Sequence, residues 1–450
     1  MAIYNDSANT ALENTLKTYY AKEGLSNLLQ RNDPFLKTLT PEYVEGKTAN
    51  FAAIYSRGGA VSARYKVAKR LATQTARAKE FKVEPGKLFT GTTYNTADIV
   101  AARSSKGAYA PVIGTKFWAS SETFRKTLAS CLYASGYGEL GVMADDAAAL
   151  VSGTLATITL PRSAVMALDI GSEIVFKTNK SDPELEASTV RAQVERLISP
   201  TQVEVNPLVA GAIASKVVCI AGGVSDDGKP LFPVGLAGWI PDTVATTDSF
   251  FGVNRSVARE RLAGSVINKA NDETILQALE RAILMLRAAG STCDKILMND
   301  EDYLEFKRIV DSKTYFQNVD GGKAKGKAEL GFKDYGLSVS TNYLENIIDT
   351  PYCPKGKVYI LDSKVVKMWV YTNTEILNKD QVNGNEAGKQ TDVTGSDTDL
   401  ENKPYQLLLD NLITVQPGTD TDDGAAAFAA LNFFGQFVIT NPSVCGVVNL

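Results

Sequence analysis

The stretch from Phe117 to Gly141 constrains the fold of this chain more than any other. Its apolar and small residues recur at the three-and-four spacing of one helical face. The members of that face are Phe117, Phe124, Leu128, Cys131, Leu132 and Ser135. Ser120 or Ser121 can cap the start, and Gly136 and Gly138 can end the helix in a left-handed conformation. The pattern predicts a strut helix of roughly 20 residues, about 30 Å long.

The region after this helix, residues 143–235, is rich in short β-branched runs. Glycine or proline separates them at Gly171, Pro183, Pro200 and Pro207. Short strands at this spacing are typical of a small sandwich or barrel. The sequence therefore predicts an all-β module inserted into a larger domain, with its strands in LVSGTLATITL, EIVFK, VRAQVERLIS, TQVEVN and KVVCIAGG.

Helices and strands alternate from residue 271 onward, which predicts an α+β class. Asn271 or Asp272 is placed to cap a helix that ends at Gly290. The strand KILM follows, and Asn299 or Asp300 caps the next helix, EDYLEFKRIV. Further strands are predicted in GLSVSTNYL and GKVYILDSKVVKMWVY. The apolar final segment, AAAFAALNFFGQFVITNPSVCGVVNL, is expected to lie within a sheet.

Two segments before the strut helix need something to pack against. Residues 9–30 read as an amphipathic helix, which cannot bury its apolar face alone. Residues 51–85 read as two extended segments with a turn or bulge at Gly58 and Gly59.

The second of these segments is strongly basic, with Glu80 as the one acid between residues 57 and 82. The bases are Arg57, Arg64, Lys66, Lys69, Arg70, Arg77, Lys79 and Lys82. Three interpretations are open: nucleic-acid contact, a solvated hairpin, or a hairpin that pairs with an acidic neighbour. Only Tyr65 and Phe81 could stack on bases, which disfavours nucleic-acid binding.

Histidine is absent from all 450 residues. Ser-His-Asp and Cys-His nucleophiles, HExxH metal sites and the usual proton shuttle at neutral pH are therefore excluded. Carboxylate or lysine chemistry is left as the route to an enzyme, but no pair of carboxylates is marked out for it. The sequence predicts a protein without catalytic residues, cofactor or metal ligands.

Three short motifs have a plainer interpretation than a ligand site. Gly136 to Gly141 (GYGELG) matches GxGxxG, but a helix rather than a strand precedes it, so it reads as a helix end. Residues 321–327 (GGKAKGK) approach a phosphate loop, yet Ala328 stands where a hydroxyl is needed. Residues 420–424 lack the spacing and distal Glu of a calcium loop. Residues 378–402 form an acidic surface excursion.

The five cysteines are Cys131, Cys219, Cys293, Cys353 and Cys445, and none forms a CxxC pair. Their isolation predicts packed, reduced thiols in a cytoplasmic setting, although a disulfide between distant cysteines stays open. The first residues, MAIYNDSANTALENTLK, lack the basic and apolar regions of a signal peptide. No apolar run has the length of a membrane span.

The order of these segments resembles the major capsid protein of tailed bacteriophages, with the Hong Kong 97-type capsid fold. The resemblance runs through an N-terminal arm, a basic extended hairpin and a helix closing in LYASGYGELG. It continues through GLAGWIPD, FFGVNRS and CDKILMNDEDYLEF to the ending FGQFVITNPSVCGVVNL. The β-rich insertion departs from the minimal fold.

The resemblance implies six regions and a set of partners. The regions are an N-terminal arm (1–47), an extended hairpin loop (48–88), a peripheral domain with a spine helix (89–142), a β-rich insertion (143–235), an axial domain (236–370) and a return to the peripheral domain (371–450). The partners are copies of itself in hexamers and pentamers, and separate scaffolding, portal and decoration proteins. Packaged double-stranded DNA would lie nearby without specific recognition. No membrane is implied, and the location is the virion, after assembly in the host bacterial cytoplasm.

Two alternatives stand beside this interpretation. An encapsulin-like cargo compartment resembles the same fold, but the inserted module and long arm have no evident cargo role. A histidine-free enzyme with a β-domain insertion is the second alternative, and ligand-dependent melting would support it.

Overall fold

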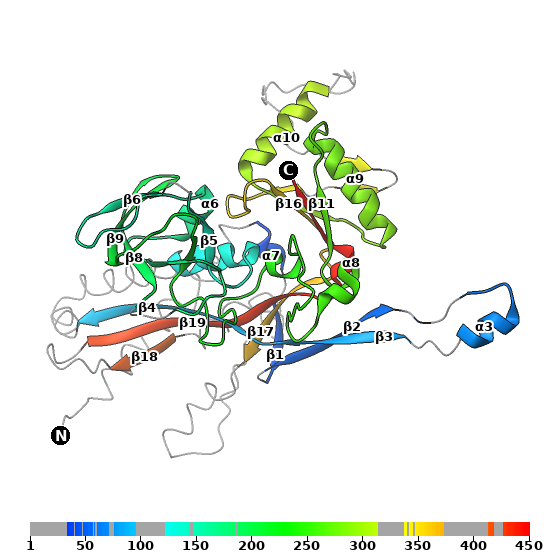
Figure 1. The fold of residues 1–450 in the computed structure, drawn as a ribbon, viewed down its shortest axis with the longest axis horizontal. Helices are drawn as coiled ribbons and strands as arrows, with labels where there is room; N and C mark the ends of the chain where they lie inside the picture. The colour runs from blue at the N-terminus through cyan, green and yellow to red at the C-terminus, as the bar shows by residue number, and fades with distance from the viewer. Residues whose placement is uncertain are drawn as a thin grey trace, which may run out of the picture.

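The computed structural model describes residues 34–39, 41–46, 48–56, 58, 61–71, 76–95, 122–144, 147–184, 188–313, 337–339, 342–344, 347–372, 413–417 and 426–450. In these ranges the chain mixes helices with sheets, which confirms the α+β class. Three larger sheets form the body, and a long hairpin projects from it (Figure 1).

The first sheet contains the long strand β19 at its centre. The strand order is β1-β17-β19-β18, and β4 also pairs with β19. β1 runs parallel to β17, and the other pairs are antiparallel. The bounds are Pro41–Glu45 (β1), Gly86–Asn95 (β4), Val366–Thr372 (β17), Ile413–Pro417 (β18) and Ala426–Ile439 (β19). Phe437 and Val438 are fully buried, which confirms that the apolar ending lies in a sheet.

The second sheet is the predicted β-rich module, with strand order β5-β10-β7-β8-β9-β6 and antiparallel pairing throughout. The bounds are Glu139–Val142 (β5), Ala156–Thr159 (β6), Glu173–Lys177 (β7), Val190–Ser199 (β8), Gln202–Val209 (β9) and Val217–Ile220 (β10), with helix α6 at Arg162–Ala167. Four of the six strands lie within the predicted runs; β9 begins in its run but continues to Val209 through Pro207, which was wrongly expected to end it and instead pairs with Ala192. In the described residues β5 and β6 are the two edge strands of one sheet and do not pair with each other, so the expected sandwich or closed barrel is not formed.

Strand β5 was missed because its letters, ELGV, follow directly on the glycines that end the strut helix. Four residues are too few to show a strand period of their own. The strand is recognisable only through its pairing with β10, nearly 80 positions later in the chain.

The third sheet, of order β11-β20-β16-β12-β15, packs against helices α9 and α10. The strands are Ser265–Asn268 (β11), Lys295–Met298 (β12), Ile347–Asp349 (β15), Lys357–Leu361 (β16) and Gly446–Asn449 (β20). The helices are Ile275–Ala288 (α9) and Asp300–Lys313 (α10). The apolar face of α9 is buried as predicted, with Ile275, Leu279, Ile283 and Leu286 at most 2% exposed.

The predicted cap of α9 is wrong. Thr274, not Asn271 or Asp272, is the N-cap: its hydroxyl accepts from the backbone N–H of Gln277. The Gln277 side chain in turn accepts from the N–H of Thr274, which completes a capping box. The cap of α10 is as predicted, since the Asn299 side chain accepts from the N–H of Glu301.

The strut helix occupies residues 122–133 of the described chain, and its predicted start at 117–121 lies outside the described residues. Phe124, Leu128 and Leu132 are at most 4% exposed, which confirms the predicted buried face. Gly136 and Gly138 follow with φ of 91° and 69°, as expected for a helix end. Gly235 lies so near this end that a Cβ there would collide with the carbonyl of Leu132.

The hairpin consists of β2 (Ala49–Ser56), helix α3 (Tyr65–Leu71) and β3 (Arg77–Val83). The two antiparallel strands confirm the predicted pair of extended segments. The helix was not predicted: the first segment was expected to run extended to Tyr65, but β2 ends at Ser56. Gly58 has φ of 67°, consistent with the expected turn.

Short elements complete the described chain. They are η1 (Leu36–Thr38), α7 (Leu236–Trp239), η2 (Arg255–Ala258), α8 (Arg259–Leu262), η4 (Pro442–Val444) and the pair β13 (Leu337–Val339) and β14 (Asn342–Leu344). β13 and β14 are antiparallel, so GLSVSTNYL forms two strands. None of the helices in the described ranges has the length and apolar character of a membrane span.

Several predicted features lie outside the described residues: the amphipathic helix at 9–30, the lysine loop at 321–327, the acidic excursion at 378–402 and the turn at 420–424. The cysteines are all described, and all five are buried free thiols. Burial raises the pKa of Cys131 and of Cys445 to about 12, which leaves the thiols protonated and unreactive at neutral pH.

Candidate functional site

The most unusual surface of the molecule is the hairpin formed by β2, α3 and β3, called the hairpin arm below (Figure 1). Its strands pair with Ala49 opposite Val83 and Phe51 opposite Phe81, and the register shifts between Ile54 and Ser56. Alternation along β2 and β3 places Phe51, Phe81 and Val83 on one face. Ala53 and Tyr55 continue this face along β2 and pack, partly buried, against the body, where Arg261 Nη1 donates to the carbonyl oxygen of Tyr55.

Aromatic side chains anchor this base. Phe51 and Phe81 stack with ring centroids 5.0 Å apart, and Phe81 lies 5.7 Å from the ring of Trp239. Trp369 of β17 contacts Phe51 edge-on at 5.9 Å. Tyr371 donates its hydroxyl to the carbonyl oxygen of Val83 at 2.8 Å. The base of the arm is therefore part of the main core, where Phe81 and Val83 are fully buried.

Beyond the base, the arm exposes apolar side chains. Ile54 is 66% exposed, Tyr65 is 82% exposed, and Val61 is fully exposed. Such residues are normal singly, but here they gather on one thin projection that has almost no core of its own. Burying a side chain of this size stabilises a contact by about 1.5–3 kcal/mol, so the outer arm is suited to a partner.

The structure brings seven of the eight predicted bases together on this arm, and Arg57 lies outside the described residues. Arg64, Lys66, Lys69 and Arg70 lie on or beside α3 at the tip, and the other three lie on β3. In the described part of the chain no acid is within ion-pair distance of Arg64, Lys66, Lys69, Arg77, Lys79 or Lys82. The arm thus combines exposed apolar groups with positive charge that these described contacts leave unbalanced.

The loop with the GxGxxG letters does not form a phosphate site. A helix precedes it and β5 begins at Glu139, which confirms the helix-end interpretation. The Glu139 carboxylate accepts hydrogen bonds from the backbone N–H groups of Ser135 and Tyr137, at 2.5 and 3.3 Å. These donors are satisfied within the chain, so they are not available to an anion. The role of Glu139 was not visible from the sequence.

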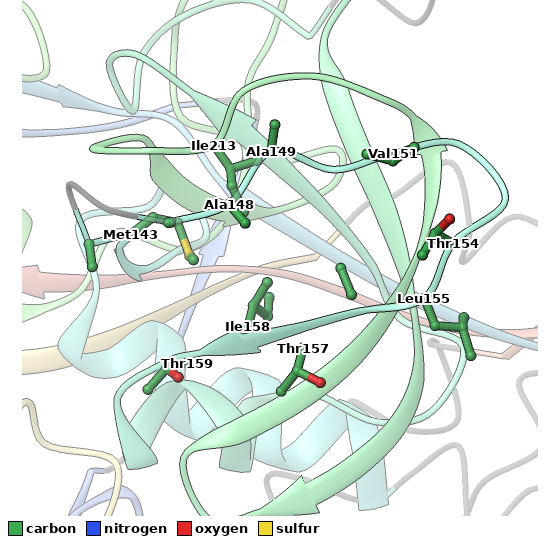
Figure 2. A pocket seen from close by; sticks show the side chains of 13 residues that line it. Met143, Ala148, Ala149, Val151, Thr154, Leu155, Thr157, Ile158, Thr159 and Ile213 are labelled. Atoms are coloured by element: carbon green, nitrogen blue, oxygen red, sulfur yellow. The ribbon is translucent and has the colours of Figure 1, made fainter.

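A pocket of about 410 Å³ lies in the β-rich module between β6 and the segment that follows β5 (Figure 2). Its lining is apolar or hydroxylic, and none of the side chains titrates. The lining residues are Met143, Ala144, Ala147, Ala148, Ala149, Val151, Thr154, Leu155, Ala156, Thr157, Ile158, Thr159 and Ile213. A pocket of this kind lacks the convergent polar groups with which an active site binds and orients a substrate.

Two carboxyl groups with shifted pKa lie at the start of α10. Burial raises the pKa of Asp300, as does the neighbouring charge of Asp349. Burial also raises the pKa of Asp302, whose carboxylate accepts from the N–H of Gly356 at 2.8 Å. This bond links α10 to the turn before β16, a structural role. In the described residues no three His, Cys, Asp or Glu side chains are grouped as metal ligands.

Comparisons with known proteins give likenesses of fold at low identity. No protein-family model matches the chain, and no curated protein does either. A chain of the cyanophage A-1(L) capsid is 14% identical over 96% of this chain and 94% of its own, with a TM-score of 0.49. A chain of Mycobacterium phage Adephagia is 12% identical over 96% of both chains, with a TM-score of 0.40.

A holo-SrpI encapsulin chain from Synechococcus elongatus PCC 7942 is also similar, at 8% identity over 100% of this chain and 96% of its own, with a TM-score of 0.40. The similar structures thus include phage proteins and an encapsulin, the two kinds of shell considered from the sequence. TM-scores below 0.5 leave the functional conclusion to the geometry of this chain.

Proposed function

We propose that this chain is a structural protein, the major capsid protein of a tailed bacteriophage, with the Hong Kong 97-type fold. Copies of it assemble into the icosahedral head shell that encloses the DNA genome. Two things support the proposal: the order of segments in the sequence resembles that family, and the hairpin arm is built for a contact outside its own chain.

The hairpin arm is the observation that carries the proposal. An isolated two-stranded hairpin is at best marginally stable in water, and among the described residues of this one full burial is confined to the base, while Ala53 and Tyr55 are only partly buried. Ile54, Val61 and Tyr65 are therefore stabilised by burial against a neighbouring subunit. Because the arm and the surface that receives it are different parts of the same chain, the contact repeats head to tail and closes into rings. Hexamers and pentamers are the rings that an icosahedral shell needs.

The charge of the chain supports the same contact. The net charge is −4 and residues 57–82 contribute +7, so the rest of the chain carries −11. A basic arm and an acidic body attract each other between copies, which favours correct orientation during assembly. Arg57, Arg64, Lys66, Lys69, Arg70, Arg77, Lys79 and Lys82 are accordingly proposed as subunit-contact residues.

The remaining regions take the roles that this fold implies. Residues 1–47 lock against neighbours, residues 89–142 and 371–450 form the peripheral domain, and residues 236–370 form the axial domain around ring centres. The insertion at 143–235 adds a surface to that body. Scaffolding, portal and decoration proteins are further partners, the DNA is held without sequence recognition, and assembly takes place in the bacterial cytoplasm. The subunit needs no cofactor and performs no catalysis.

Negative-stain electron microscopy and light scattering of the purified chain, alone and with the other head proteins, test the proposal. Closed shells, or rings that convert to shells, are expected. A monomer or dimer under every condition would overturn it and favour the enzyme alternative. Shells isolated with a packaged enzyme in place of DNA would identify an encapsulin-like compartment instead.

A further inference from the structure

A tight turn packs against the base of the hairpin arm. Phe250 and Val253 exchange two backbone hydrogen bonds, at 3.0 and 2.9 Å. The residues between them, Phe251 and Gly252, have φ of 47° and 78°, as in a type I′ turn. Positive φ is normal for glycine but uncommon for phenylalanine, so surrounding contacts must hold Phe251 in place.

This turn contacts both the arm and the body. The carbonyl oxygen of Phe251 accepts from the backbone N–H of Lys82 in β3 at 3.0 Å. Phe250 and Phe251 pack on Trp239 with ring centroids 5.0 and 5.6 Å apart, on the same indole that contacts Phe81. Trp239 is itself tied to β19, since its Nε1 donates to the carbonyl of Phe437 at 2.7 Å.

Arg255 contacts both the turn and the segment that contains Trp239. Its guanidinium lies 3.9 Å from the ring centroid of Phe250, and its Nε is 2.7 Å from Oδ2 of Asp248. Its Nη1 donates to the carbonyl oxygens of Gly238 and Trp239, at 2.8 and 3.3 Å. Arg255 is only 5% exposed, so these contacts are made in a largely dry environment. One side chain thus connects the turn to the helix that presents Trp239.

We propose that Arg255 is a positioning residue: with Asp248 it holds Phe250 and Phe251 against Trp239 and thereby sets the direction in which the hairpin arm leaves the body. The described strands of the arm contact the body from the base to Tyr55, whose carbonyl oxygen accepts from Arg261, so a small rotation of the strands becomes a larger displacement of α3 at the tip. The inference concerns the isolated subunit, and it matters for assembly only if the proposed function holds.

The planar fork of arginine is needed for this role. Arg255 binds a carboxylate through one edge and two carbonyls through another, while its face lies on a ring. Lysine offers a single compact charge and cannot make all three contacts at once. Arg255→Lys is therefore expected to keep the direction of the arm only in part. Arg255→Met, which retains only the apolar stem, is expected to lose it.

The test is a distance measurement by double electron–electron resonance on the full chain under conditions where light scattering shows no assembly. Nitroxide labels are attached at Lys66→Cys on the tip and Asp272→Cys on the body, both exposed positions. The native cysteines are buried, and unsubstituted protein treated with the same label measures their background. Arg191→Met is the matched control, because Arg191 pairs with Glu173 at 3.0 Å in the β-rich module, away from the arm.

The expected result is one narrow distance distribution in the parent and in the Arg191→Met control. Arg255→Met should add a second population of on the order of 10% or more, and Arg255→Lys a smaller one. An unchanged distribution in Arg255→Met, with a melting temperature lowered as in the control, would overturn the proposal. If Arg255→Met fails to fold, Asp248→Asn replaces it, with the same expected and contrary results. A chain that never assembles would refute the proposed function but would leave this measurement intact.

Discussion

Two hairpins of this molecule, the hairpin arm and the β8–β9 hairpin of the β-rich module, are built alike and packed differently. Both pair antiparallel strands of similar length and both contain register shifts. In β8–β9 one face is buried over the first half of β8 and the middle of β9, with Ala192, Val194, Val203 and Val205 fully inside the module core, while Glu195–Ser199 is not buried. Among the residues of the arm that the structure describes, only Phe81 and Val83 on β3 reach that state.

The two hairpins also differ in whether their charged side chains are paired within the chain. β8–β9 pairs its own charges across the strands, with Arg196 Nε 2.9 Å from Glu204 Oε2. In the described residues Arg64, Lys66 and Lys69 of the arm have no such acid. Strand pairing by itself therefore says little about stability. One hairpin is completed by its own domain, and the other is left for a second molecule to complete.

The largest contrast is expected from a buried charge placed in each hairpin. Val194→Asp should destabilise folding by about 4 kcal/mol or more, because an unpaired carboxylate would replace a fully buried side chain. Ile54→Asp, at a position 66% exposed, should change the free energy of unfolding by no more than about 0.5 kcal/mol. Urea denaturation of the unassembled chain measures both. Equal losses would show that the arm is already packed within its own subunit.

Removing the apolar tip of the arm should abolish assembly and spare the fold. Val61→Ser combined with Tyr65→Ser removes two exposed side chains, whose burial in a subunit contact is worth roughly 3–5 kcal/mol together. The melting temperature of the unassembled chain should stay at its parental value, while no shells should form at the concentrations at which the parental chain assembles. If the variant forms shells at the parental concentration, the tip of the arm does not take part in the subunit contact.

The base of the arm should respond to alkaline pH through Tyr371. Burial raises the pKa of its hydroxyl to about 12, from about 10 in the unfolded chain. The folded state therefore keeps this proton to a higher pH than the unfolded chain does. The stabilising effect of the buried hydroxyl is complete below pH 10 and is lost as the pH rises to 12. The loss should reach about 2 kcal/mol. Tyr371→Phe should remove this component from the pH profile of unfolding, and an identical profile would contradict the burial of that hydroxyl.

Reversing the charge of the tip should weaken assembly about tenfold at low salt. The variant carries Arg64→Glu, Lys66→Glu and Lys69→Glu. Parental assembly should weaken as salt is raised, because exposed charges are screened beyond about 10 Å at 0.1 M, and the variant should lose that dependence. Light scattering against salt concentration measures both. Indifference to reversal and to salt would mean that the bases do not pair with a neighbouring subunit.

The smallest effect is expected from the paired charge of the other hairpin. Arg196 is 66% exposed on its side chain, so Arg196→Ala should cost about 0–1 kcal/mol of stability and should leave assembly unchanged. It is the matched control for the charge reversal. If it impaired assembly as strongly as the reversal does, the distinction between the two hairpins would fail.

The parts of the fold that could be predicted are those encoded in neighbouring residues. The β7, β8 and β9 strands lie where β-branched runs indicated them, and the buried face of α9 follows from its three-and-four spacing. Errors arose where two local signals competed. Thr274 caps α9 although Asn271 and Asp272 are good caps, and a helix, Tyr65–Leu71, begins at the last residue of the first segment that reads as extended. Propensity alone does not decide such cases.

The candidate site was only half visible in the sequence. The bases of the arm could be identified by composition, and seven of them lie where a hairpin would place them. The anchor of the arm could not, because it joins Phe51 and Phe81 to Trp239 and Trp369 across distant parts of the chain. No local pattern marks such a contact.

Local sequence specified most of the strands and helices, the end of the strut helix and the apolar positions, because each depends on residues a few positions apart. The contacts that those segments make depend on the tertiary structure. It buried one face of β8–β9 and left the arm exposed, and it aimed Arg255 at Phe250 and at the carbonyl of Gly238. Burial and directed hydrogen bonds depend on groups brought together from distant positions, so they stabilise the fold only after those parts of the chain have come together.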